Sequence, residues 1–225
     1  MRVAGLAVIL LAAGCSLSPP ATVSRQLPVQ ASSFALAEMV RRVGLSRVIL
    51  SDHAALVADS AVAGPQWLDP VAVQAVPAMV AAFLADHDPG GRSVYAAAAR
   101  AYAAQLGALE IDYRSSLADC ARPDLITADT AFAPTAARYG FVDHAASAPG
   151  VADLIRRERI PVVFTETGAS ANTVPQVAAA TGARVEQLDT TRVRTPAEAA
   201  RGATYLSLMT DNLAKLRTAL ACAAA

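Results

Sequence analysis

The first regular pattern in the chain is an amphipathic stretch over residues 34–43. Its apolar side chains recur every three or four residues, Ser33 precedes it and Gly44 follows it. A hydroxyl residue before a helix and a glycine after it are typical of helix ends. We therefore predict a helix here. The run 47–50 predicts a short strand, and 51–64 carries no regular pattern.

Two longer helical patterns follow. Residues 71–85 predict a helix that ends before the turn-forming sequence Asp-Pro-Gly-Gly at 88–91. Residues 93–117 predict a long, alanine-rich helix, which in a chain of 225 residues is expected to span the molecule as a strut. Its predicted apolar face is Val94, Ala98, Tyr102, Leu106, Leu109 and Tyr113.

Beyond Cys120, strand and helix patterns alternate. Strands separated by helical segments are typical of βαβ units, so we predict an α/β fold with a parallel sheet flanked by helices. The predicted strands are 125–127, 160–164 and 184–188, and the predicted helices are 131–139, 151–159, 173–181 and one or two within 196–222.

Composition narrows the function classes. The 19 Lys and Arg residues balance 19 Asp and Glu residues, whereas proteins that track nucleic-acid phosphates need a net basic face, so we expect no nucleic-acid partner. A hydrophobic content of 54% with 17% charged residues excludes a disordered chain. The sequence lacks a Gly-rich phosphate loop, a Gly-x-Ser-x-Gly elbow and a His-Glu-x-x-His helix, and we expect no enzymatic activity.

The first 26 residues predict export and anchoring. Arg2 precedes the apolar run 3–13, and the sequence Leu-Ala-Ala-Gly before Cys15 resembles the bacterial lipobox, where the cysteine is lipidated after cleavage. We predict a lipoprotein signal peptide over 1–14, lipid attachment at Cys15, and a tether over 15–26 that holds the protein on the extracytoplasmic face of the cell membrane. The alternative is an ordinary signal peptide with a coincidental cysteine.

The two other cysteines, Cys120 and Cys222, would then lie in an oxidising compartment. An even number of cysteines there favours a disulfide, which would tie the C-terminal helix to the body of the protein. The alternative is two buried free thiols.

Three acidic residues follow predicted strands. Asp129, Glu166 and Asp189 come at or just after the carboxyl ends of three strands, where open parallel sheets bind their ligands. Carboxylates gathered at one edge repel each other unless a cation lies among them, and a hard divalent ion would fit. The alternative is that these acids cap the helices that follow. The histidines at 87 and 144 are expected to be solvated loop residues.

Several short segments, spread over nearly all of the chain after Cys15, form an ordered set. They are Ser33–Val40 with Val43-Gly44, Trp67–Pro70, Leu84–Pro89, Tyr95–Leu109, Ile126–Phe132 with Arg138–Gly140, Ile160–Glu166, Thr181–Asp189, Tyr205–Met209 and Asn212-Leu213. In this order they resemble the zinc/manganese-type substrate-binding proteins of ABC transporters.

The resemblance implies two α/β lobes joined by a rigid helix, with a metal ion held between the lobes and delivered to a membrane permease. It implies a shortened N-terminal lobe over 27–88, a connecting helix over 89–117 and a C-terminal lobe over 118–225. The protein is expected to be a monomer that binds manganese or zinc, with calcium as a further possibility, and that works with the permease of a metal-ion ABC transporter.

The site residues depart from the family pattern. Gln66 lies near the place where the family pattern has a ligand histidine, and Asp129 occupies the place of a second ligand histidine. Asp189 matches the last ligand of the family. Glu166 matches an acid of the site region that resembles a supporting residue more than a ligand. The strands that carry the family's first histidine are expected to be deleted, and His53 is a candidate substitute.

An amide and carboxylates form a hard oxygen set, whereas imidazoles suit zinc. We therefore expect weak binding that favours manganese or calcium over zinc. The alternative is a degenerate relative that has lost the metal and serves as a structural or partner-binding lipoprotein.

Overall fold

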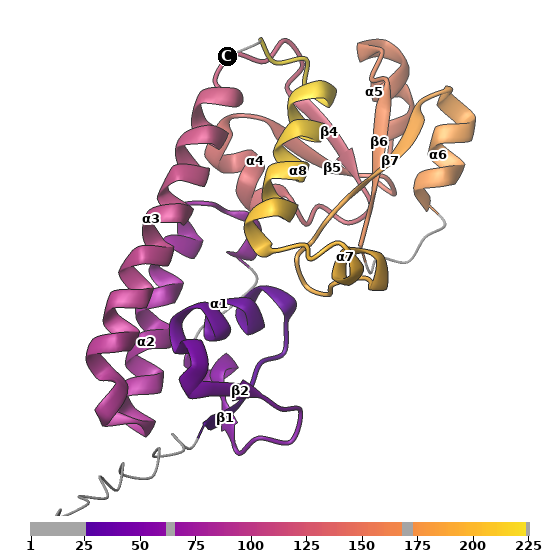
Figure 1. Ribbon diagram of the computed structural model, residues 1–225. Helices are drawn as coiled ribbons and strands as arrows, with labels where there is room; N and C mark the ends of the chain where they lie inside the picture. The colour runs from indigo at the N-terminus through magenta and orange to yellow at the C-terminus, as the bar shows by residue number, and fades with distance from the viewer. Residues whose placement is uncertain (1–25, 62–65, 168–172, 224–225) are drawn as a thin grey trace, which may run out of the picture.

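The computed structural model describes residues 26–61, 66–167 and 173–223. Its N-terminal lobe contains a parallel sheet of three strands in the order β2-β1-β3; α1 packs against β2 and the long helix α3, and α2 packs against α1 and along α3 (Figure 1). The elements are β1 Leu27–Gln30, α1 Phe34–Gly44, β2 Val48–Leu50, β3 Leu56–Val57, α2 Val76–His87 and α3 Arg92–Ser116. Short 3-10 turns occupy Leu45–Arg47, Ala58–Ala61, Gln66–Leu68, Ala72–Ala75 and Pro89–Gly91.

The C-terminal lobe is built from two parallel strand pairs, β4 with β5 and β6 with β7. Because β4 lies beside β6, the pairs follow one another across the lobe. The elements are β4 Asp124–Thr127, α4 Ala133–Tyr139, β5 Val142–Ala145, α5 Val151–Glu158, β6 Val162–Glu166, α6 Thr173–Thr181, β7 Arg184–Leu188, α7 Pro196–Ala200 and α8 Tyr205–Ala219. The predicted α/β fold, with two lobes and a long helix running beside both, is confirmed (Figure 1).

Helix α3 is present as predicted, but its buried face differs over the first two turns. Tyr95 and Ala99 are buried, whereas the predicted Val94 is 39% exposed and Ala98 is half-buried. Tyr95 and Ala99 continue the spacing of Tyr102 along one side of the helix, and burial of a tyrosine ring removes more apolar area from water than burial of valine. The larger side chain therefore sets the rotation of the helix.

The two ends of α1 lie where the sequence predicts them, but Gly44 does not have the expected role of a helix-ending glycine. The Ser33 hydroxyl accepts a hydrogen bond from the Leu36 N–H, as expected of an N-cap. At the other end Leu45, rather than Gly44, has a positive φ, of 52°, with ψ of −134°. Gly44 is required by packing, because a Cβ there would lie 2.3 Å from Cγ1 of Val48.

The sheet of the C-terminal lobe is covered on both faces. Leu125 and Phe164 face a core that continues through α3 and α8 into α1 and α2, whereas Ile126 and Val163 face a second core beneath α5 and α6. This alternation follows from the period of two along a strand. Both faces are therefore apolar, as parallel sheets require.

Three short strands were not predicted. β1 and β3 of the N-terminal lobe and β5 of the C-terminal lobe read Leu-Pro-Val-Gln, Leu-Val and Val-Asp-His-Ala, which contain no apolar run like the Val-Ile-Leu of the equally short β2. His144 was expected in a loop, but it lies on β5 and its Nε2 is 2.7 Å from Oδ1 of Asp124. The predicted helix over 71–85 is a 3-10 turn followed by α2.

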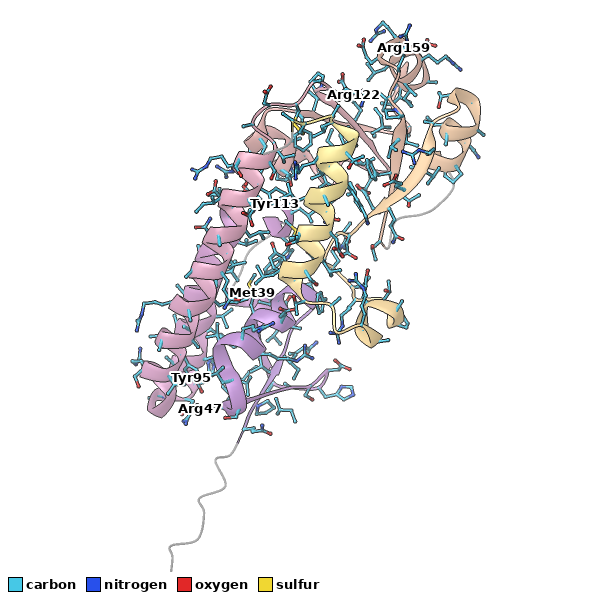
Figure 2. All side chains as sticks on the ribbon, turned by 45° about the horizontal axis from the view of Figure 1, so that its top comes forward. Met39, Arg47, Tyr95, Tyr113, Arg122 and Arg159 are labelled. Atoms are coloured by element: carbon cyan, nitrogen blue, oxygen red, sulfur yellow. A yellow bond between two sulfur atoms is a disulfide. The ribbon has the colours of Figure 1, made fainter. Side chains whose placement is uncertain are left out.

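A polar cluster fixes the end of the N-terminal lobe where α2 turns into α3. Asp88 accepts hydrogen bonds from Nε of Arg47 at 2.8 Å and from the hydroxyl of Tyr95 at 2.5 Å. Figure 2 shows Arg47 beside Tyr95 at this end of α3. The cluster joins the α2–α3 turn to the residue that leads into β2.

Cys120 and Cys222 form a disulfide with an S–S distance of 2.03 Å. It joins the segment after α3 to the segment after α8, and backbone hydrogen bonds from Ala121 and Arg122 to 220–221 run beside it. The predicted lipid attachment at Cys15 lies outside the described residues. None of the described helices combines the length and apolarity needed to cross a bilayer.

Candidate metal centre

The loop after β4 carries Asp129 and is held from the neighbouring strand. The Thr127 hydroxyl donates to Oδ1 of Asp143 at 2.7 Å, and the Phe132 N–H donates to Oδ2 of the same carboxylate at 3.0 Å. Burial raises the pKa of Asp143 to about 6, although the hydrogen bonds from Thr127 and Phe132 oppose the shift. Asp143 therefore fixes both ends of the loop that presents Asp129.

Glu166 lies at the end of β6 and is 4% exposed. Among the residues that the structure describes, neither of its carboxylate oxygens finds a hydrogen bond of ordinary geometry. Burial and, after it, the neighbouring carboxylate of Asp129 raise its pKa to about 8, although the Thr127 hydroxyl opposes the shift. The Glu166 carboxyl group is buried, whereas Asp129 is exposed, and a buried carboxyl group beside a second one needs a bound proton or a neighbouring cation.

Asp189 follows β7 and is 6% exposed. Its Oδ1 accepts the Thr191 N–H at 2.6 Å, and its Oδ2 accepts the Thr167 hydroxyl at 3.1 Å. Burial and the carboxylate of Glu198 on α7 together raise its pKa to about 6, against the hydrogen bond from Thr191. Sequence reasoning missed Glu198, whose only local sign is a capping box with Thr195.

The segment that begins at Gln66 is clamped to the C-terminal lobe. Asp69 accepts hydrogen bonds from Nε and Nη2 of Arg138 on α4, at 3.0 and 2.6 Å. The Trp67 carbonyl accepts the Tyr205 hydroxyl at 2.5 Å. Burial raises the pKa of Asp69, but the hydrogen bonds from Arg138 and from a backbone N–H outweigh it, so that the pKa is lowered. The Gln66 side chain lies outside what the structure describes.

The structure therefore brings Asp129 to Glu166 and Asp189 to Glu198. Among the residues that it describes, no three His, Cys, Asp or Glu side chains gather closely enough to hold a metal ion. His53 lies in the exposed β2–β3 turn, where its backbone N–H donates to the Ser51 hydroxyl at 3.4 Å. The donors near the predicted site are oxygens, which suit a hard cation.

Comparison of the sequence with known proteins matches the chain to one family. Residues 64–219 match the family model for ZnuA, "Zinc-uptake complex component A periplasmic". The high-affinity zinc uptake system protein ZnuA of Bacillus subtilis is 28% identical over 166 residues, covering 68% of this chain and 52% of that protein. The iron-binding protein YfeA of Yersinia pestis is 31% identical over 140 residues, covering 56% and 45%. The chain thus spans about half the length of these relatives.

Solved structures share the fold at low identity. The Zn(II)-bound ZnuA-like domain of AdcA from Streptococcus pneumoniae superposes with a TM-score of 0.74 at 15% identity, covering 87% of this chain and 99% of that one. The laminin-binding protein Lmb of Streptococcus agalactiae gives 0.75 at 16% identity, covering 87% and 100%. The family is one of transport solute-binding proteins and not of enzymes, and from the match over 64–219 this chain belongs to that ZnuA family.

Proposed function

We propose that this chain is the extracytoplasmic solute-binding protein of a metal-ion ABC transporter and that it binds a divalent cation between its lobes. The observation that carries the proposal is the Glu166 carboxyl group. It is buried beside Asp129, and within the described part of the chain neither of its oxygens has a hydrogen bond of ordinary geometry. A cation would satisfy the Glu166 oxygens and remove the repulsion between the two carboxylates.

The proposed ligand set is Asp129, Glu166, Asp189 and Gln66. Asp189 follows a parallel strand of the same lobe as Glu166, and its carboxylate is already oriented by two hydrogen bonds. Gln66 would be the contribution of the N-terminal lobe. Because these donors are oxygens, we propose weaker binding than in relatives with histidine ligands and a preference for manganese or calcium over zinc. Relatives named for zinc and for iron support a transition-metal cargo.

The rest of the proposal concerns placement and partners. We propose a signal peptide over 1–14, a lipid anchor at Cys15 and a tether over 15–26. The lobes would be 27–88 and 118–225, joined by a connecting helix over 89–117. The partner would be the permease of a metal-ion transporter, which receives the cation from a monomeric, membrane-anchored receptor.

Calorimetric titration of the chelator-treated protein tests the site. Wild type should bind Mn²⁺, and Glu166→Gln, Asp129→Ala and Asp189→Ala should each weaken the binding at least tenfold, because a charged ligand is lost. Glu158→Gln is the matched control, because Glu158 is an exposed glutamate on α5. Submicromolar zinc binding that survives Asp129→Ala and Asp189→Ala would refute the site assignment.

A role without metal, in which the protein binds a protein partner, is the second candidate function. The described residues hold no group of three metal-ligating side chains, and the segment 67–69 is already bonded to the C-terminal lobe. A family member that has lost its metal and binds a protein partner would have these features. Elemental analysis of protein purified without chelator separates the two: bound manganese, iron or zinc near one equivalent supports the receptor, and its absence together with no binding in the titration supports the degenerate relative.

A further inference from the structure

The segment that follows β7 has an unusual backbone directly beyond the proposed ligand Asp189. Thr191 is fully buried and has φ of 55°, in the left-handed region. A β-branched residue rarely adopts this conformation, and it persists only where its surroundings impose it. The Thr191 hydroxyl has no hydrogen-bond partner in residues 26–61, 66–167 and 173–223, and no hydrogen bond of its own side chain to these residues stabilises the conformation.

Hydrogen bonds from both lobes impose this backbone conformation on Thr191. From the C-terminal lobe, the Asp189 carboxylate accepts the Thr191 N–H at 2.6 Å, and Asn212 on α8 bonds both the N–H and the carbonyl of Asp189, at 2.9 and 2.7 Å. Asn212 is itself fully buried. The backbone before Thr191 is therefore fixed by its own lobe.

From the N-terminal lobe, the first turn of α1 fixes the other side. The Phe34 N–H donates to the carbonyl of Arg192 at 2.8 Å, and the Ala35 N–H donates to the carbonyl of Thr191 at 3.1 Å. The first N–H groups of a helix have no partner within the helix, so their bonds depend on an outside acceptor. Consecutive peptide units of this segment thus bond α1 through the carbonyls of Thr191 and Arg192 and orient the Asp189 carboxylate through the Thr191 N–H.

We propose that the N-terminus of α1 is a positioning element for Asp189, so that cation binding and docking of α1 on the C-terminal lobe stabilise each other. This inference rests on the proposed function. The docked α1 holds Thr191 with its N–H directed at Oδ1 of Asp189, which fixes the carboxylate in one orientation. Outer partners of this kind preorganise metal ligands. By linkage, a cation that binds Asp189 strengthens the α1 contact by the same factor.

The sharpest perturbation is Phe34→Pro, compared with Phe34→Ala. Phe34 is the first residue of α1, where proline is well tolerated, and Ser33 before it is already extended, with φ of −129° and ψ of 156°, as proline requires of its predecessor. Both variants lose the ring and its stacking with Arg194. Only the proline variant loses the N–H that bonds Arg192.

The experiment titrates chelator-treated protein with Mn²⁺ alone and measures hydrogen exchange of the Ala35 amide with and without Mn²⁺. Phe34→Pro should bind about tenfold more weakly than Phe34→Ala, at the lower end of the range for an outer partner of a ligand. In wild type and in Phe34→Ala, Mn²⁺ should slow exchange of the Ala35 amide by about tenfold, the same factor by which the proline variant loses affinity. A purely structural role for α1 would lower the melting temperature without this cation-dependent change.

A second pair of variants guards against a proline variant that does not fold. Thr191→Gly removes the penalty of the left-handed backbone, whereas Thr191→Ala keeps a Cβ. With glycine the segment no longer needs α1 to hold its conformation. Mn²⁺ should then slow exchange of the Ala35 amide much less than it does in Thr191→Ala, and adding Thr191→Gly to Phe34→Pro should restore most of the lost affinity.

The outcomes separate this inference from the proposed function. If wild type and Asp189→Ala bind Mn²⁺ equally or not at all, the proposed site is wrong and the positioning role is wrong with it. If binding depends on Asp189 but Phe34→Pro and Phe34→Ala agree within twofold, and Mn²⁺ leaves exchange of the Ala35 amide unchanged, the positioning role alone is overturned.

Discussion

Glu166 should make the metal-free protein less stable as the pH rises through neutrality. Its pKa is raised from 4.5 to about 8, chiefly by burial and next by Asp129. The folded state therefore keeps a proton that the unfolded chain releases near pH 4.5. The stability that this proton confers is complete below pH 4.5, declines as the pH rises, and is lost above pH 8.

The magnitude follows from the size of the shift. Where only the folded state holds the proton, the free energy of unfolding falls by about 1.4 kcal/mol per pH unit. Asp143 and Asp189, both with a pKa of about 6, change stability in the same direction mainly below pH 6. Between pH 6.5 and 8 the decrease therefore reports chiefly Glu166, and we expect about 1.5 kcal/mol.

Urea denaturation of chelator-treated protein at four pH values across this interval measures the effect. Glu166→Gln cannot titrate there, so its free energy of unfolding should lose about 1.5 kcal/mol less than that of wild type over the same interval. Glu158→Gln, at an exposed position on α5, should retain the slope of wild type. Saturating Mn²⁺ should also flatten the wild-type slope, because a bound cation replaces the proton.

One result would refute the reasoning. If wild type and Glu166→Gln lose stability in parallel from pH 6.5 to 8, Glu166 is already ionised at pH 6.5 and is solvated or paired in solution. The case for a cation beside Asp129 would then lose its main support.

Three further predictions concern the framework that holds the site. Cys222→Ser should destabilise the protein by up to about 4 kcal/mol, since the disulfide closes a loop of 102 residues; thiol counting on the unfolded, unreduced wild type should find no free thiol in the form starting at residue 16. Gly91→Ala should lower stability by about 1–3 kcal/mol, because its Cβ would lie 2.5 Å from the tyrosine ring in the first turn of α3. Gly107→Ala in the same helix has no neighbour nearer than 3.9 Å and should raise the melting temperature; equal effects of the two substitutions would contradict the packing argument. Arg138→Ala should reduce the free energy of unfolding by about 2 kcal/mol, because it leaves the buried Asp69 carboxylate unpaired, whereas a loss below about 0.5 kcal/mol in urea denaturation would show the pair to be solvated.

The sequence by itself was sufficient for elements whose pattern is long or whose ends are marked. α1, α3 and β7 lie within one residue of their predicted bounds, because helical spacing, capping residues and alternation are properties of consecutive residues. The ordered segments also identified the family, which the match over 64–219 confirms. The pairing of Cys120 with Cys222 followed from the compartment and the even number of cysteines.

Tertiary structure decided which neighbours each element meets. β1, β3 and β5 have at most four residues, and they become strands because a parallel partner supplies their hydrogen bonds. Tyr95 set the rotation of α3 through contacts with α2 and the N-terminal lobe. Such choices depend on residues tens of positions away, and a local pattern carries no information about them.

The residues of the candidate site also fall into those that the sequence marks and those that only the tertiary structure reveals. Asp129, Glu166 and Asp189 were marked in the sequence by their position after strands. Asp143, Asn212, Glu198 and the first turn of α1 were not, because each acts on a loop that is distant in sequence. A ligand can be predicted from its place on a strand, whereas the groups that orient it and shift its pKa are known only once the chain has folded around it.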